Sequence, residues 1–183
     1  MEDKLLKKLI VLLLMLCSLL SVAGCDTISE GSNDKQQPAQ VETKKISFVV
    51  YRPTADGSEK LLPEKITVED DGKGLPENAL RALIERKPQS DKTADIVPKG
   101  TKVLGLKIAS DGTAYADFSK EIAKRDQGSY NEFMLTGAIV NTLTEFPEIK
   151  QVQILVEGEK VITLGGHMDL EDPLKRNKTL LQK

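Results

Sequence analysis

The sequence predicts an α+β fold in which two helices cover one face of a mixed sheet. Several short segments carry apolar residues at every second position, which is typical of half-buried strands. Two longer segments carry apolar residues at helical spacing, and Gly, Pro and Asp residues separate the segments. The predicted order is β-β-α-β-β-α-β, an arrangement that buries the helices against the sheet.

Residues 44–74 are expected to form an N-terminal β-hairpin. In residues 45–51, the side chains of Ile46, Phe48 and Val50 alternate with more polar ones and share one face. Residues 53–57 supply the turn, and residues 61–69 form the returning strand. Pro63 has no N–H to donate to a ladder, so this part of the strand should be an edge or a bulge.

The first helix is predicted over residues 76–87. Pro76 suits the first helical position, Glu77 complements the positive end of the helix dipole, and Pro88 ends the helix. A second hairpin follows, with strands at 101–109 and 113–118 around Asp111-Gly112, which predicts a type I′ turn. The core face of its second strand consists of Ala114, Ala116 and Phe118. Tyr115 and Asp117 are expected on the opposite face.

The second helix is predicted over residues 129–146 and ends before Pro147. Ser129 and Glu132 have the spacing of a capping box, in which each side chain accepts a hydrogen bond from the other residue's backbone N–H. Glu132 is alternatively a catalytic carboxylate, but its position favours the capping role. Residues 151–157 form the next strand, Gly158-Glu159 turns the chain, and residues 161–164 are a candidate last strand. Residues 169–183 form the C-terminal tail, and its basic, sparsely apolar part, residues 174–183, is expected to fray.

The first 24 residues have the pattern of a secretory signal peptide: a basic start, a short apolar run and a small-residue cleavage site. Val22-Ala23-Gly24-Cys25 resembles the bacterial lipobox. The resemblance implies that the Cys25 thiol is first diacylated with palmitate-type chains and that the chain is then cut between Gly24 and Cys25. The new amino group of Cys25 is a further acylation site in the same resemblance. An uncleaved transmembrane anchor is the alternative, although the uncharged run over residues 9–25 is shorter than the ~20 residues of a spanning helix. Either reading places the domain outside the cytoplasm. Residues 25–43 are polar and are expected to form a disordered tether.

Composition excludes several classes of function. The formal net charge is −2, so no basic footprint for a nucleic acid is expected. The two cysteines are Cys17, inside the signal peptide, and Cys25, so no disulfide is expected in the exported domain.

The sequence holds one histidine, His167, in a loop with Gly165 and Asp169. A metal site needs more ligands than this loop offers, so neither a metal nor a cofactor is expected. No Ser/His/Asp arrangement for nucleophilic catalysis is evident either. A small-ligand site or an envelope enzyme with its site near Gly165, His167 and Asp169, together with the Tyr115/Asp117 face, is the alternative function.

Several short segments together resemble the GerM domain of sporulation and spore germination proteins. They are residues 79–84, 96–103, 114–119, 128–132, 139–147 and 152–158. The resemblance covers residues 75–168, and the preceding hairpin fits it. It implies an exported, lipidated and non-catalytic module whose fold is similar to the ring-building motifs of membrane-spanning assemblies, linked to sporulation or germination.

We therefore expect a lipid-anchored protein on the outer face of the cytoplasmic membrane. Cys25 would hold the chain to membrane lipid, and the GerM-like domain would bind another envelope protein or copies of itself. An exposed strand edge and the outer faces of the helices are the candidate contact surfaces.

Overall fold

The computed structural model describes residues 44–123 and 128–182, and it contains the predicted N-terminal hairpin. Strand β1 (Lys45–Pro53) pairs antiparallel with β2 (Leu61–Glu69) along their whole lengths. The alternation read from the sequence buries Phe48 and Val50. The predicted signal peptide, the lipobox-like residues with Gly24 and Cys25, and the predicted tether all lie outside the described residues.

The main sheet is mixed, as predicted. It consists of β3 (Val103–Ile108), β4 (Thr113–Phe118), β5 (Gln151–Val156) and the short β6 (Glu159–Lys160), in that order. Strand β7 (Leu174–Lys175) also pairs with β5. β3 and β4 are antiparallel neighbours in sequence, whereas β4 and β5 are parallel because a helix lies between them in the chain.

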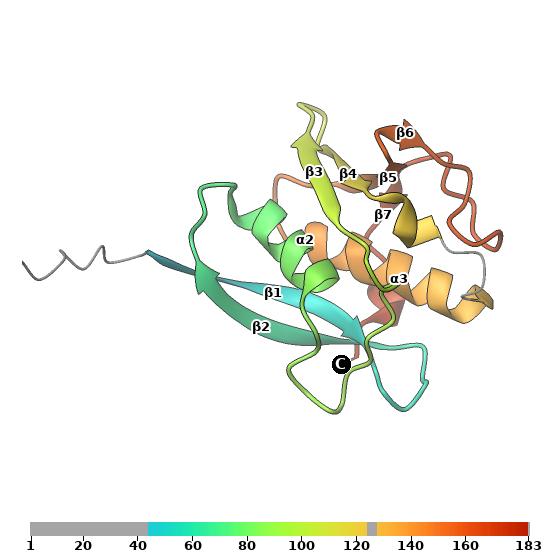
Figure 1. Cartoon of the computed structure of the whole chain (residues 1–183), viewed down its shortest axis with the longest axis horizontal. Coiled ribbons are helices and arrows are strands. Elements are labelled where there is room, and N and C mark those ends of the chain that lie inside the picture. Colours follow the sequence, from blue (N-terminus) through green and yellow to red (C-terminus); the bar gives the residue numbers. More distant parts are fainter. Residues whose placement is uncertain (1–43, 124–127, 183) are drawn as a thin grey trace, which may run out of the picture. The chain divides into compact units, whose positions relative to one another are not determined.

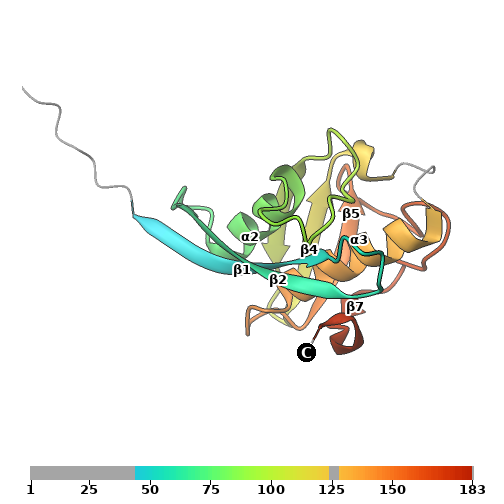
Figure 2. The same cartoon turned by 90° about the horizontal axis from the view of Figure 1, so that it is seen from below.

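Helices α2 (Leu75–Glu85) and α3 (Gly128–Leu143) lie on one face of the main sheet (Figure 1). Short 3₁₀ turns occur at Lys120–Ala123 (η1) and Lys178–Leu180 (η3). The hairpin is not part of the main sheet. It covers the other side of the two helices, as the view from below shows (Figure 2). The predicted fold class is confirmed, with this separate layer as a difference.

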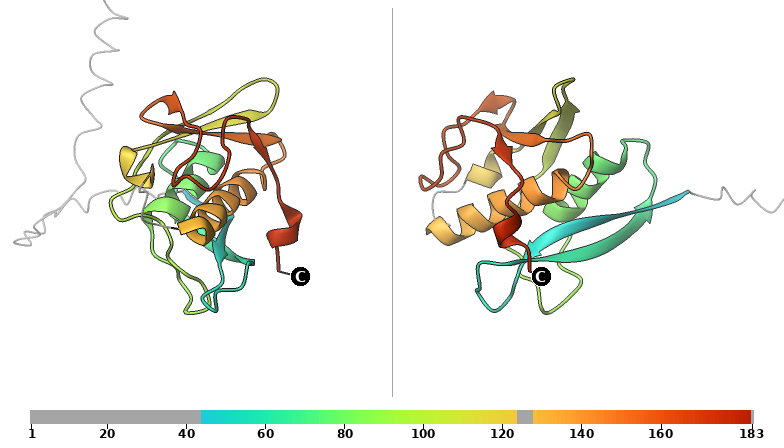
Figure 3. Two further views of the ribbon diagram at one scale, coloured as in Figure 1. Left: turned by 90° about the vertical axis from the view of Figure 1, so that its right-hand side faces the viewer. Right: turned by 180° about the vertical axis from the view of Figure 1, so that it is seen from behind.

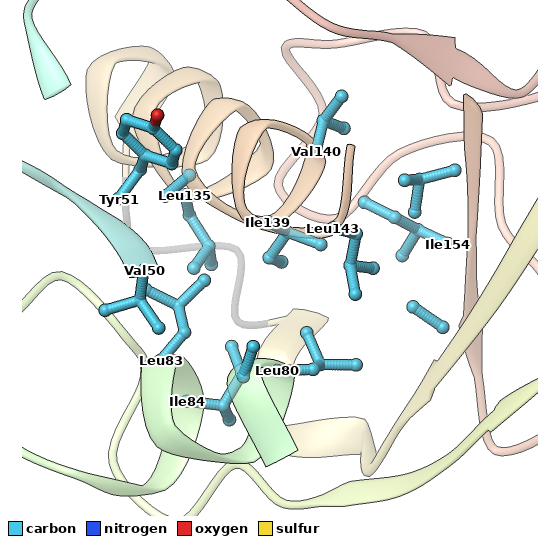
Figure 4. Packing of buried hydrophobic residues seen from close by; sticks show 14 of the residues in the cluster. Val50, Tyr51, Leu80, Leu83, Ile84, Leu135, Ile139, Val140, Leu143 and Ile154 are labelled. Atoms are coloured by element: carbon cyan, nitrogen blue, oxygen red, sulfur yellow. The ribbon is translucent and has the colours of Figure 1, made fainter. Parts of the chain in front are cut away.

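The reason for the extra layer is the composition of α3, which is apolar nearly all round and needs cover on both sides. Leu135 and Ile139 lie beside residues of the hairpin and of α2, and Leu143 lies close to Ile154 of β5 (Figure 4). Leu80, Leu83 and Ile84 of α2, Val50 of β1, and Ala116 and Phe118 of β4 belong to the same core. Among the residues that the structure describes, no helix combines the length and apolar character needed to cross a bilayer.

A buried arginine fastens the hairpin to α2. Arg52 is 1% exposed; its Nε donates to Glu64 Oε2 at 3.0 Å, and its Nη2 donates to the carbonyls of Ala82 and Arg86. Ala82 lies in the last turn of α2 and Arg86 is its C-cap, and carbonyls at this end of a helix have no partners within the helix. Thr93 donates its hydroxyl to the other Glu64 oxygen, so the loop after α2 joins the same network.

The prediction of a frayed C-terminal tail is wrong. Leu170 and Leu180 are buried, and β7 pairs with β5. Residues 169–182, the C-terminal segment, run from the main sheet past α3 to the hairpin, where Leu181 bridges Leu61 (Figure 3). The segment approaches α3 at Gly137, where an added Cβ would lie 2.5 Å from Leu180 Cδ1.

Arg176 in the middle of the C-terminal segment explains why this basic stretch is ordered. Its guanidinium donates to the carbonyl of Asn141 on α3 and pairs with Glu145 at 2.6 Å. It also lies 5.3 Å from the ring centroid of Tyr51 on β1. The basic charge that suggested a solvated tail is therefore used to hold α3 and the hairpin together.

Two turns differ from the prediction. Asp111 does not have the positive φ that a type I′ turn requires; its carboxylate instead accepts from the N–H of Thr113, and Gly112 carries the positive φ. The two-residue turn with positive φ at both positions is Glu157-Gly158, between β5 and β6. The predicted strand over residues 161–164 is absent there; β6 ends at Lys160, and irregular backbone follows.

Candidate interaction site

Glu132 does not complete the predicted capping box. The glutamate is 2% exposed, and its carboxylate turns toward the loop at 163–167. Oε1 accepts from the Thr163 hydroxyl at 2.6 Å and from the N–H of Leu164 at 2.9 Å, and Oε2 accepts from the N–H of His167 at 2.9 Å. The loop offers more donors than a helix cap does, so the carboxylate binds the loop.

Burial alone would raise the pKa of Glu132, but hydrogen bonds from the loop outweigh burial and hold the pKa below its ordinary value. The carboxylate is therefore ionised at neutral pH and serves as the acceptor around which the loop folds. Gly165 leaves room for it, since an added Cβ would lie 2.9 Å from Glu132 Oε2. Glu132 is a structural residue here, in a role that the sequence did not indicate.

The alternative site near Gly165, His167 and Asp169 is not assembled. The side chains of His167 and Asp169 are exposed, and the Asp169 carboxylate accepts from the N–H of Glu171. The N–H groups of Leu164 and His167 donate to Glu132 and not to a ligand. Within residues 44–123 and 128–182, no cluster of three or more His, Cys, Asp or Glu side chains is arranged to hold a metal.

Tyr115 and Asp117 do lie together on the outer face of the main sheet. With Leu106, Lys107 and Leu155 they line an open hollow of about 590 Å³. Residues 165–169 do not line it, so the structure separates the two parts of the predicted pocket. The hollow is open to solvent, whereas small-molecule sites are clefts that bury most of the ligand surface.

The two edges of the main sheet differ. On one side, β6 and β7 cover the two ends of β5, and the side-chain amide of Gln153 donates to the carbonyl of Leu170 between them. On the other side, β3 pairs with β4 alone in the part of the chain that the structure describes. β6 and the C-terminal segment thus cover one edge, and the β3 edge stays open.

The open edge carries exposed apolar side chains. Leu104 is 48% exposed and Ile108 is 38% exposed. Leu104 lies at a bulge, where the register shifts between Val103 and Gly105. The N–H of Ala109 donates to the carbonyl of Thr113, so Ala109 is at a position that is hydrogen-bonded to β4. In an antiparallel pair every second residue has its backbone N–H and C=O directed toward the neighbouring strand, so those of Leu106 and Ile108 point away from β4.

A basic groove of about 640 Å³ adjoins this edge. It is formed by the C-terminal end of α2 and residues 95–104, and it contains Val103 and Leu104 at the start of β3. Its cations are Arg81, Arg86, Lys87, Lys99 and Lys102. Its carboxylates are Glu85 and Asp95. Glu85 pairs with Arg81 and also accepts from the N–H of Val103, which shows that the open edge of β3 faces the groove.

Sequence reasoning missed the basic groove because its cations are spread over the loop that follows α2. The loop folds back when Ala94 donates to the carbonyl of Pro53 and Thr93 donates to Glu64, which returns Lys99 and Lys102 to the end of α2. Arg86, Lys87, Lys99 and Lys102 form no ion pair with a described carboxylate. The sequence feature that indicates this groove is the high density of Lys and Arg between residues 86 and 102.

The chain was compared with models of known protein families and with curated proteins. A family model named Germane, described as sporulation and spore germination, matches residues 49–162. The chain belongs to this family. The match confirms the predicted GerM-type domain and includes most of the hairpin. The Germane description names cellular processes and no reaction. Among curated proteins, none matches the chain.

Solved structures agree with the Germane fold. The tandem GerMN domains of the sporulation protein GerM from Bacillus subtilis match with a TM-score of 0.62 and 20% identity, covering 72% of this chain and 46% of that one. The first GerMN domain alone gives 0.59 and 24% identity, covering 72% and 98%. A candidate lipoprotein from Clostridium perfringens gives 0.50 and 29% identity, covering 72% and 87%. This chain therefore spans about half the length of the tandem protein.

Proposed function

We propose that this protein is a lipid-anchored, non-catalytic interaction module of the cell envelope, acting in sporulation or germination. Cys25 holds it to the outer face of the cytoplasmic membrane, and the Germane domain binds another envelope protein. The lipobox-like Val22-Ala23-Gly24-Cys25, the family description and the similarity to a candidate lipoprotein support this proposal.

The observation that carries the proposal is the asymmetry of the main sheet. The C-terminal segment covers the β5 edge, whereas the β3 edge is open and presents exposed Leu104 and Ile108. An open edge offers a row of backbone donors and acceptors, which is the feature used when an extended segment adds to a sheet. The alternative, a small-ligand or enzymatic site near His167, draws no support from a loop whose donors bind Glu132.

Crosslinking in living cells tests this function. The full-length tagged protein is crosslinked and its partners are identified by mass spectrometry, with Cys25→Ala as the matched control. One dominant envelope partner that is lost in the control is the expected result. Recovery of the protein without any protein partner would overturn the proposal.

A further inference from the structure

We propose that the open edge of β3 and the basic groove beside it bind an extended, acidic segment of a partner protein. The segment adds to the main sheet as a further strand. This inference rests on the proposed interaction function and names the surface and the chemistry of the partner.

The backbone of β3 provides the pairing. The N–H and C=O groups of Leu106 and Ile108 point away from β4, toward the position of a next strand. Their side chains share a face with Ala116 and Ala114, their buried partners on β4, yet Ile108 is 38% exposed because no neighbouring strand covers it. Apolar side chains of an added strand would cover both residues, as neighbouring strands do within a sheet.

The charges select an acidic segment. Arg86, Lys87, Lys99 and Lys102 are exposed and free of ion pairs with described carboxylates, and they line the groove that opens onto the start of β3. Lys107 lies on the outer face of β3, opposite Tyr115. Along β3 itself, alternation places apolar residues of the segment on the inner face and carboxylates on the outer face, near Lys107. The end of the segment that extends past Val103 brings its carboxylates to the cations of the groove.

The same charges oppose a second copy of this chain. The β3 strand of a second copy, Val103–Ile108, carries Lys107 and no carboxylate, so it lacks the negative charge that the basic groove would bind. The β5 edge of another copy is already covered by β6 and β7. A lysine and a bulge on an edge strand also discourage indiscriminate pairing, and a carboxylate-bearing partner turns that lysine into a favourable contact.

A binding measurement tests the chemistry. The probe is a short fluorescent peptide of alternating Val and Glu, titrated with the full chain in detergent and followed by anisotropy. Lys99→Glu with Lys102→Glu is expected to weaken binding by at least about tenfold. Lys65→Glu with Lys160→Glu, which makes the same change of charge on β2 and β6, is expected to leave it unchanged. Methylation of alternate backbone nitrogens of the peptide should also weaken binding, because it removes the peptide's backbone hydrogen bonds to β3 without altering the protein. Equal binding of a Val/Lys peptide would overturn the proposal.

Site-specific crosslinking in cells separates this inference from the proposed function. A photoreactive benzoylphenylalanine is placed at Leu104 and, in a second strain, at Ile162, which is exposed outside the groove. The expected result is an adduct at Leu104, carrying an acidic segment of another protein, that is lost on charge reversal of Lys99 and Lys102. An adduct at Ile162 alone would keep the proposed function and overturn the inference. An adduct of the chain with itself at Leu104 would also overturn it, and no adduct at either position would count against both.

Discussion

Replacing Glu132 with Gln tests how the loop at 163–167 is held. In Glu132→Gln, the amide oxygen still accepts from the Thr163 hydroxyl and the N–H of Leu164, but the amide nitrogen faces the N–H of His167. The variant loses a charge-assisted hydrogen bond and leaves a donor without an acceptor. The free energy of unfolding is therefore expected to fall by about 2–4 kcal/mol.

The difference between the two proteins depends on pH in a defined direction. The folded state lowers the pKa of Glu132 from its ordinary 4.5, so the ionised carboxylate stabilises the fold fully above that value. This contribution disappears as the pH falls through the lower folded pKa. Urea unfolding of the compact unit Val41–Lys183, followed by circular dichroism at neutral and acidic pH, should show the two proteins converging in acid. A difference that is independent of pH would refute the reasoning.

A double-mutant cycle distinguishes this role from the capping box. Glu132→Gln combined with Thr163→Val is expected to show an interaction energy of about 1 kcal/mol, because the hydrogen bond from Thr163 is charge-assisted with Glu132 and only neutral with Gln. Glu132→Gln combined with Ser129→Ala should be additive. Strong coupling to Ser129 without coupling to Thr163 would restore the capping interpretation.

Three further changes test other parts of the molecule. Gly137→Ala should lower the free energy of unfolding by about 1–3 kcal/mol, since the new methyl group meets Leu180, and Leu180→Ala should cost less in that background than alone. Additive costs would contradict this contact. Arg52→Met leaves Glu64 buried without its cation and should cost about 3–5 kcal/mol in urea unfolding, with partial recovery on adding Glu64→Gln. Cys25→Ala should move the protein out of the membrane fraction in cell fractionation, and retention there would argue against lipid anchoring.

The elements of this fold were largely predictable because their signals are local. Alternation placed Ala114, Ala116 and Phe118 in the core, and all three are fully buried. The spacing of Leu80 and Leu83 likewise gave the buried face of α2. The separate position of the hairpin was not predictable in this way, because α3 shows apolar residues on all sides and local pattern does not say which element covers which side.

The candidate site was less predictable because it depends on long-range contacts. Lys99 and Lys102 meet the end of α2 only after the loop folds back onto the hairpin. Glu132 has the spacing of a helix cap, yet its carboxylate binds residues more than thirty positions further along. Arg176 lies in a stretch whose composition resembles a solvated tail, and its role depends on Tyr51 and Glu145 from distant parts of the chain.

The path of the C-terminal segment has a consequence for when the domain reaches its final form. Lys60 donates to the carbonyl of Thr179, a residue 119 positions later, and Leu181 bridges Leu61 next to it. Contacts of such long separation form late and slow folding, because the intervening chain must first be brought together. The contacts of the C-terminal segment with the hairpin therefore form only after residues 169–182 have been made. A protein that crosses a membrane as an extended chain, as proposed here, benefits from this delay, since premature folding would obstruct its export.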